Sequence, residues 1–303
     1  MIRTNNVVLI LGAGASYPYG FPTGERLVDL MTNVDDIKLA QFMRHVRHFS
    51  EHHIKEFCED LGNSGLSSID RFLQRRQDYS AVGKSMIAFM LMKFESAKNL
   101  RGSAEGRWYR YLYNDIINAL TLEEFANNHL NIITYNYDRS LEKFFFDALK
   151  SGFHLTDPDA AKWAASIPIV HVHGSFGPLP WMGNDARQYS DDYDQIEAAK
   201  KRLHIVSDDI EESGVMDECG RLLDRASHVV FLGFGYDPVN VDRLQLQDRC
   251  ANAQFVGTRY DMTESEIRIV NQTQFAPQNL RFSWEGRDVD CLSFLRQHRD
   301  VFF

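Results

Sequence analysis

The sequence contains little cysteine. Its 303 residues include four cysteines that are far apart and form no CxxC pair: Cys58, Cys219, Cys250 and Cys291. A zinc ribbon needs cysteines in closely spaced pairs, and a disulfide framework needs many cysteines in a short chain. The four residues are therefore typical of isolated thiols in a reducing compartment. We expect neither disulfides nor a metal site.

Long hydrophobic runs are also absent. No stretch approaches the roughly 20 apolar residues that a membrane-spanning helix needs. Arg3, the apolar run 7–11 and the small residues 13–15 resemble a signal peptide, but this apolar run is short. Cleavage there would also remove the segment that fits best with the rest of the chain. We therefore expect a soluble, cytoplasmic protein that does not bind a membrane.

The charge balance lacks a basic excess. There are 33 basic and 42 acidic residues, which give a net charge of −9. A general nucleic-acid-binding surface needs an excess of Lys and Arg, so direct binding to nucleic acid is not expected. The hydrophobic content of 44% is enough to bury a sizeable core. We expect one domain that spans residues 1–303.

The most informative segment is a hydrophobic run followed by a glycine turn. Residues 7–11 are all apolar, which favours a strand buried on both faces of a parallel sheet. Gly12 and Gly14 carry no Cβ that would keep an anion away from backbone N–H groups, and a helix N-terminus attracts anions. These features predict a phosphate site. The same turn could instead serve only to pack a helix tightly on the sheet.

Helical and strand signals alternate along the rest of the chain. Such alternation predicts an α/β fold, a doubly wound, Rossmann-like parallel sheet with a large helical insertion after the first strand. The insertion is predicted over residues 24–130, where Ser68 is a plausible N-cap. Further strands are predicted at 130–134, 167–172, 228–233, 253–257 and 279–282, and helices at 194–202, 215–226 and 290–303.

Polar or glycine-bearing clusters follow three of these strands. Asn136 and Asp138 follow the strand 130–134, His173 follows 167–172, and Gly233 follows 228–233. Ligands bind such sheets at the carboxyl ends of the strands, so the clusters together predict a ligand site. Each cluster also has a simpler explanation, such as capping of a helix by Asn136 or Asp138.

Three common kinds of site fit less well. Tyr17 replaces the third glycine of the dehydrogenase fingerprint, and no Gly-Lys-Ser/Thr follows the turn as in a P-loop. His171 and His173 alternate as strand residues on one face would, which allows a metal pair. However, no acidic or cysteine partner follows at ligand spacing, so a metal site is not predicted.

In order along the chain, these motifs resemble the sirtuin (Sir2) superfamily. The resemblance covers about residues 7–25 and 130–260 and implies a Sir2-like NAD-binding domain with NAD as the substrate. The matching segments are Gly12-Ala13-Gly14-Ala15-Ser16 with Gly20-Phe21-Pro22, Thr134-x-Asn136-x-Asp138, His173-Gly174-Ser175 and Gly233-Phe234-Gly235.

The resemblance also implies a role for each site residue. Asn136 and Asp138 would line the nicotinamide-ribose pocket, and His173 would act as a general base near the ribose hydroxyls. Histidine titrates near neutral pH, and an amide can position a water molecule against the anomeric carbon. The implied cofactor-binding residues are Gly12, Ala13, Gly14, Ala15, Ser16, Pro22, Thr134, Gly233, Gly235 and Asp237.

Departures from the family pattern indicate which branch of the sirtuin superfamily the chain resembles. The four-cysteine zinc module of deacylating sirtuins is missing, and residues 23–26 replace the usual Asp-Phe-Arg. No peptide-binding Phe-Gly-Glu segment is found. The pattern is most similar to the zinc-free Sir2-like domains of bacterial anti-phage systems, which destroy NAD in abortive infection. It implies an NAD⁺ glycohydrolase that forms nicotinamide and ADP-ribose.

Unregulated NAD hydrolysis would kill the host, so we expect activity to be controlled by assembly. The expected assembly is a homo-oligomer, or a complex with a ring-forming ATPase/translocase or an Argonaute-type protein. Two alternatives stay open: an NAD-dependent protein-lysine deacylase, and a regulatory module that binds NAD or ADP-ribose without turnover. The sequence does not decide between hydrolysis and cyclisation. For Asp70 it favours a capping or salt-bridge role.

Overall fold

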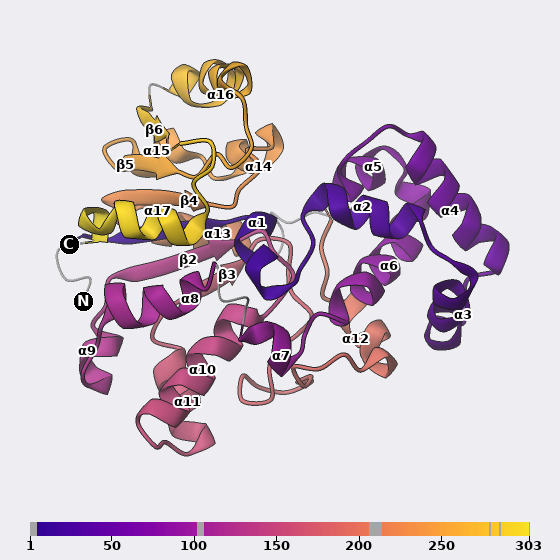
Figure 1. Cartoon of the computed structure of the whole chain (residues 1–303), viewed down its shortest axis with the longest axis horizontal. Coiled ribbons are helices and arrows are strands. Elements are labelled where there is room, and N and C mark those ends of the chain that lie inside the picture. The colour runs from indigo at the N-terminus through magenta and orange to yellow at the C-terminus, as the bar shows by residue number, and fades with distance from the viewer. Residues whose placement is uncertain (1–4, 102–105, 206–213, 279, 285, 303) are drawn as a thin grey trace.

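A parallel six-stranded sheet forms the centre of the computed structural model, which describes residues 5–101, 106–205, 214–278, 280–284 and 286–302 (Figure 1). The strand order is β3-β2-β1-β4-β5-β6. This is the order of doubly wound, Rossmann-like sheets, so the predicted fold class is confirmed. The strands are β1 Val7–Leu11, β2 Leu130–Thr134, β3 Ile169–His171, β4 His228–Leu232, β5 Gln254–Gly257 and β6 Phe282–Trp284.

Two strands differ from the prediction by more than one residue. β3 covers only part of the predicted range 167–172, because Pro168 has no N–H to donate and lies just outside the paired residues. β6 starts at the last residue of the predicted range 279–282. Leu280 donates its N–H to the Phe275 carbonyl at 3.1 Å and so closes a turn before the strand begins, while residue 279 lies outside the described part of the chain.

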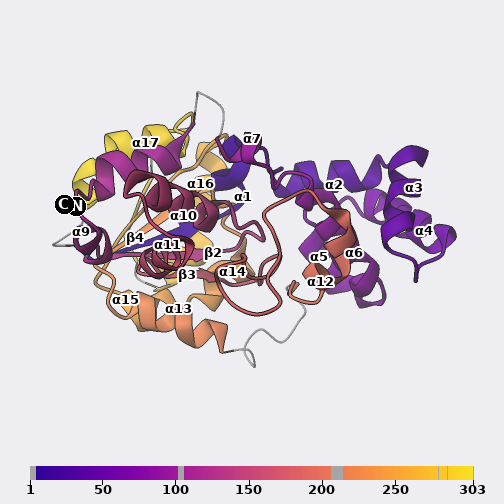
Figure 2. The same cartoon turned by 90° about the horizontal axis from the view of Figure 1, so that it is seen from below.

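The alternating side chains of β1 enter two separate hydrophobic clusters. Val7, Leu9 and Leu11 lie in one cluster, and Val8 and Ile10 lie in the other. Both clusters are covered by helices, so β1 is buried on both faces (Figures 1 and 2). The first cluster includes α8 Trp108–Tyr111, α10 Ser140–Gly152 and α17 Cys291–Gln297, and the second includes α13 Val215–Leu223, α14 Pro238–Arg243 and α15 Leu246–Cys250.

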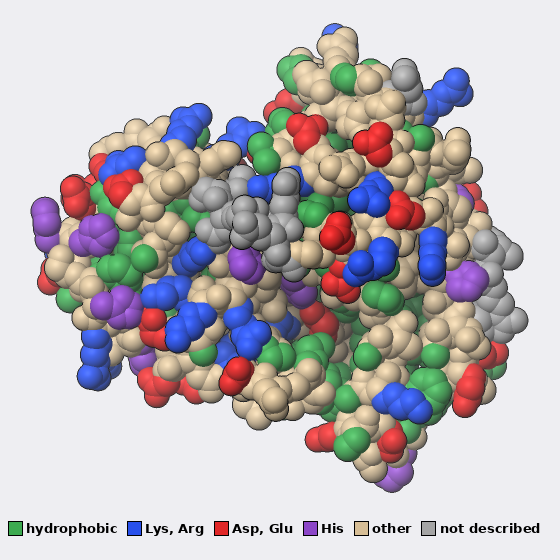
Figure 3. Space-filling model, turned by 180° about the vertical axis from the view of Figure 1, so that it is seen from behind, with side chains coloured by type: hydrophobic (Ala, Val, Ile, Leu, Met, Phe, Trp, Pro, Cys, Tyr) green, Lys and Arg blue, Asp and Glu red, His purple; other side chains and the backbone are tan. Residues whose placement is uncertain are grey.

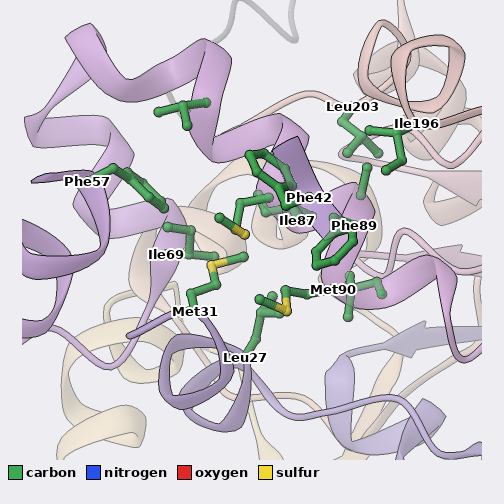
Figure 4. Packing of buried hydrophobic residues seen from close by; sticks show 14 of the residues in the cluster. Leu27, Met31, Phe42, Phe57, Ile69, Ile87, Phe89, Met90, Ile196 and Leu203 are labelled. Carbon is green, nitrogen blue, oxygen red and sulfur yellow. The ribbon is translucent and has the colours of Figure 1, made fainter. Parts of the chain in front are cut away.

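Most of the helical insertion forms a separate lobe with its own core. Figure 1 shows this helical lobe beyond the end of β1 at which α1 (Ala13–Ser16) begins. Leu27, Met31, Ile69 and Met90 converge in its interior (Figure 4). The lobe consists of α2 Gly24–Thr32, α3 Asp36–His45, α4 Glu51–Asn63, α5 Ile69–Arg75, η2 Gln77–Tyr79, α6 Ser80–Met92 and, from much later in the chain, α12 Ile196–Lys200.

The segments that form the lobe are not the same as the predicted insertion at residues 24–130. Ile196 and Leu203, which follow β3, belong to the same core as α2 to α6 (Figure 4). Conversely, the last part of the range 24–130 packs on the sheet, because Trp108 and Phe125 lie in the cluster around Val7. Those later elements are α8, η3 Leu112–Ile117 and α9 Leu122–Ala126, and α7 Ala97–Leu100 precedes them in the chain.

Local signals at helix termini are accurate. Ser68 caps α5, as predicted, by accepting a hydrogen bond from the Arg71 N–H at 3.4 Å. The predicted closing helix is α17, which Asp290 caps. The helices predicted at 194–202 and 215–226 are shorter, because they end at Lys200 and Leu223.

In the described segments no helix combines the length and the apolar character needed to cross a membrane. Basic and acidic side chains occur together on both lobes of the face drawn in Figure 3. The remaining elements are η1 Tyr17–Tyr19, α11 Asp157–Ala164, η4 Tyr193–Gln195, α16 Glu264–Val270, η6 Asn271–Phe275, η7 Ala276–Gln278 and η8 Arg299–Phe302.

Candidate functional site

The glycine turn after β1 lies against the turn after β4, where the strand order reverses. Gly12 donates its N–H to the Leu232 carbonyl at 3.1 Å, and Gly14 donates to the Gly233 carbonyl at 2.9 Å. A Cβ on Gly12 would lie 2.6 Å from the Gly233 oxygen. Close packing of two backbone turns therefore explains these glycines. Because the two N–H groups already have partners, they are not donors for a phosphate in this conformation.

Asn136, Ser16 and Asp138 form a chain of hydrogen bonds at the carboxyl end of the sheet. The Asn136 amide Nδ2 donates to the Gly12 carbonyl and to Ser16 Oγ, both at 2.9 Å. Ser16 Oγ in turn donates to Asp138 Oδ2 at 2.6 Å. The Asn136 backbone N–H donates to Thr134 Oγ1 at 3.1 Å. The structure thus brings together five residues that the sequence places in the site.

Asp138 is a buried carboxylate with two functions. Its second oxygen, Oδ1, accepts from the backbone N–H of Ser140 at 3.1 Å and also from the Ser140 hydroxyl, so it holds the first residue of α10. Burial raises the pKa of Asp138, while the hydrogen bonds from Ser140 and Ser16 act in the opposite direction. Support for the start of α10 and a place in the candidate site are therefore compatible for this residue.

A small cavity of about 100 Å³ opens beside this chain. Ligand pockets are commonly at least about 300 Å³, so a dinucleotide needs more space than this conformation provides. Asp70 and Asp138 are the acidic residues of its wall. Its lining residues are Ala13, Ser16, Phe21, Pro22, Thr23, Gly24, Leu27, Ser68, Ile69, Asp70, Leu91, Tyr135, Asn136, Tyr137 and Asp138.

His173 is not among the residues that line this cavity. Its ring packs against the rings of Tyr135 and Tyr137, with centroids 5.4 Å and 6.3 Å away, and its side chain is 2% exposed. Burial lowers the pKa of His173, and the negative charge of Asp70 opposes that shift. Its Nδ1 has no hydrogen-bond partner among the described residues.

His171 holds the backbone of the site and does not act together with His173. Its Nδ1 lies 2.8 Å from the Asn136 carbonyl oxygen, and its Nε2 lies 2.5 Å from Glu142 Oε1 on α10. β3 ends at His171, so the alternation of a strand does not extend to His173. Within the described ranges, no group of three or more His, Cys, Asp or Glu side chains could hold a metal ion.

The contact between His171 and Glu142 predicts a pH-dependent contribution to stability. Burial alone would lower the pKa of His171, but Glu142 raises it above its usual value. The stabilisation is therefore complete below about pH 6.5 and is lost as the pH rises through the raised pKa. We expect Glu142→Gln to lower the free energy of unfolding by about 1.5–3 kcal/mol at acidic pH.

Denaturant titrations at several pH values measure this effect. The loss caused by Glu142→Gln should be larger near pH 6 than near pH 9. Glu123→Gln, an exposed glutamate in α9, is the matched control and should show little loss at any pH. An equal loss for Glu142→Gln at both ends of the range would show that protonation of His171 plays no part.

Some of the other predicted site residues line the cavity, and others lie in the turn after β4. Pro22 and Ala13 belong to its lining. Gly233 packs on the glycine turn, whereas no atom lies within 4 Å of a Cβ placed on Gly235. Asp237 caps α14 and pairs with Arg71 of the helical lobe, with Nη2 and Oδ2 2.7 Å apart. This ion pair links the lobe to the turn after β4.

Sequence reasoning missed the hydrogen bonds that join the site to segments far apart in the chain. Trp108 donates its indole N–H to the Ala15 carbonyl at 2.7 Å, and the Tyr109 hydroxyl lies 2.7 Å from Ser140 Oγ. Tyr137 donates to Asp70 Oδ1 at 3.2 Å. These partners are 31 to 93 positions apart in the chain, so no local motif could reveal them.

Comparison with known proteins finds similarity to solved structures. No protein-family model matches the sequence, and no curated protein matches it. Among solved structures, the chain is similar to a Sir2 homolog in complex with NAD, with 14% sequence identity and a TM-score of 0.47. The similarity covers 99% of this chain and 91% of that one. The fold class stated above rests on the strand order and pairing of this chain itself.

Proposed function

We propose that the chain is a single Sir2-like domain with NAD⁺ glycohydrolase activity, which cleaves NAD⁺ to nicotinamide and ADP-ribose. The observation that carries the proposal is the chain of Asn136, Ser16 and Asp138 beside a cavity at the carboxyl edge of a doubly wound sheet. Dinucleotides bind such sheets at this edge, where the strand order reverses. The sequence motifs that resemble sirtuins supply these same residues.

The residues fit the chemistry of this cleavage. Breaking the bond between nicotinamide and ribose develops positive charge on the sugar, and a fixed carboxylate such as Asp138 stabilises it. Asn136 is held in one orientation by two hydrogen bonds, so it can direct a water molecule to the anomeric carbon. The products require one water molecule, whose oxygen bonds to the carbon that nicotinamide leaves.

We assign the role of general base to His173. Burial lowers its pKa, so the ring is neutral at pH 7 and can accept a proton. Tyr135 and Tyr137 line the cavity and pack against this ring, so they must move when the larger substrate enters. We further propose that assembly with other copies or a partner causes this opening, as an anti-phage effector that depletes NAD would require.

Cleavage of NAD⁺ by the purified chain, followed by chromatography of the products, tests the proposal. We expect nicotinamide and ADP-ribose without any acylated peptide, and a decrease of about 10²–10⁴-fold in rate for His173→Ala. His228→Ala, at the opposite end of the sheet on β4, is the matched control and should retain activity. Equal activity in the two variants would contradict the role of His173.

A second candidate is a module that binds NAD or ADP-ribose without turnover. One observation favours it: His173, the assigned general base, is outside the cavity wall. Under this candidate, NAD⁺ is recovered intact after long incubation although it binds. Removal of acyl groups from acetyl-lysine peptides would instead support a deacylase.

A further inference from the structure

Asp70 is a charged residue that the helical lobe contributes to the cavity. It lies in the first turn of α5 and lines the cavity together with Ser16, Asn136 and Asp138. Its Oδ1 accepts a hydrogen bond from the Tyr137 hydroxyl at 3.2 Å. Its neighbour Arg71 forms an ion pair with Asp237 and so does not neutralise Asp70.

The cavity wall is acidic. Asp70 from the lobe and Asp138 from the edge of the sheet both face it, and its described lining includes no Lys, Arg or His. Burial raises the pKa of Asp70, and Asp237 adds to that rise. His173, the hydrogen bond from Tyr137 and Arg243 act in the opposite direction and favour the charged carboxylate. Burial of a carboxylate is unfavourable, and none of the cationic groups that act on Asp70 belongs to the described cavity wall, so such a site gains by binding a positively charged group. Phosphate and carboxylate groups are repelled from it.

We propose that Asp70 is a substrate-contacting residue that makes this cavity select a positively charged pyridinium ring over its neutral form. The identity of the ligand rests on the proposed function, and the inference adds which residue of the lobe recognises the charge of its ring. The ring nitrogen of oxidised nicotinamide carries a positive charge. The ring of NADH is nearly the same size and is neutral, so charge distinguishes the two ligands.

The position of Asp70 also suits the cleavage step. When the bond between the ribose carbon and the ring nitrogen breaks, its electron pair leaves with nicotinamide, and the positive charge moves to the ribose. Asp70 and Asp138 then both face a cation in a space with little water, where an electrostatic attraction is stronger than in bulk solvent. In this proposal the helical lobe therefore contributes a residue to the site.

Equilibrium binding of two ligands to the full chain tests the inference. The ligands are a cleavage-resistant NAD⁺ analogue with a carbocyclic ribose, and NADH. We expect wild-type protein to bind the cationic analogue at least about tenfold more tightly than NADH, which corresponds to about 1.4 kcal/mol. Asp70→Asn should reduce this ratio to about twofold, through weaker binding of the cation. Asp70→Glu, which keeps the charge, should largely retain it.

Asp36→Asn is the matched control, because it removes the same charge from an exposed position of the same lobe. It should leave the ratio unchanged. An unchanged ratio in a folded Asp70→Asn protein overturns the inference, as does a wild-type protein that binds both ligands equally or neither. If the ratio depends on Asp70 but NAD⁺ is never cleaved, the inference holds and the proposed hydrolase activity fails.

Discussion

Glu95→Gln is expected to lower the free energy of unfolding by about 3–5 kcal/mol, because it leaves buried cations without their counter-charge. Glu95 is fully buried between two arginines. Arg139 donates from Nε to Oε1 at 2.9 Å and from Nη2 to Oε2 at 2.6 Å, and Arg187 also donates to Oε2. The side chains of Arg139 and Arg187 are only 2% and 3% exposed.

The cluster joins two parts of the chain that are far apart in sequence. Arg139 also donates to the carbonyls of Gly177, Arg187 and Gln188, each at 3.0 Å, so it fixes the loop between β3 and η4. Burial lowers the pKa of both Arg139 and Arg187 to about 10, which shows how strongly this environment disfavours their charge. Glutamine keeps the shape of Glu95 but supplies no negative charge.

Chemical denaturation of the wild-type protein and of Glu95→Gln at neutral pH measures this loss of unfolding free energy. Glu51→Gln is the matched control, because Glu51 pairs with Lys55 at 2.7 Å with both side chains about half exposed. Exposed pairs contribute about 0–1 kcal/mol, so the control should unfold almost as the wild type does. A loss below about 1 kcal/mol for Glu95→Gln would mean that water reaches the two arginines.

Gly233→Ala is expected to be more damaging still, with a loss of more than about 4 kcal/mol or failure to fold. A Cβ on Gly233 would lie 2.1 Å from the Ala15 backbone nitrogen and 2.4 Å from the Gly14 carbonyl carbon. Neither backbone atom can move without separating the turns after β1 and β4. The φ of Gly233 is also 56°, a region that residues with a side chain rarely adopt.

Gly235→Ala provides the comparison for this prediction. It lies two residues further on, has no atom within 4 Å of an added Cβ, and is not among the residues with positive φ. Its thermal unfolding temperature should stay close to that of the wild type, because surface changes of this kind are usually within about 0.5 kcal/mol. Equal behaviour of the two variants would show that the two turns separate easily.

The sequence predicts those parts of the fold that depend on local patterns. Residues 7–11 form β1 as predicted, since five apolar residues in a row fit a strand covered on both faces. The capping role of Ser68 follows from its own side chain. The position of α12 in the lobe core could not be predicted in this way, because Ile196 has partners in helices that end before residue 93.

The motifs predict which residues lie near one another but not how they are arranged. They put Ser16, Asn136 and Asp138 at one edge of the sheet, where hydrogen bonds join them. They do not reveal that His173 lies behind two tyrosines, or that Asp70 reaches the same cavity from the insertion. Both facts depend on packing between segments far apart in the chain, which no spacing rule describes.

The placement of β1 has a consequence for biosynthesis. This central strand is made first, yet Val7 pairs with Leu130 on one side and with His228 on the other. Contacts between residues so distant in sequence form slowly, because a long loop must close before they stabilise anything. During translation, more than 100 further residues are therefore added after the five apolar residues of β1 before either of its partner strands has been synthesised. During that interval they form an unpaired, aggregation-prone segment. A chaperone that shields residues 7–11 would therefore raise the yield of folded chains.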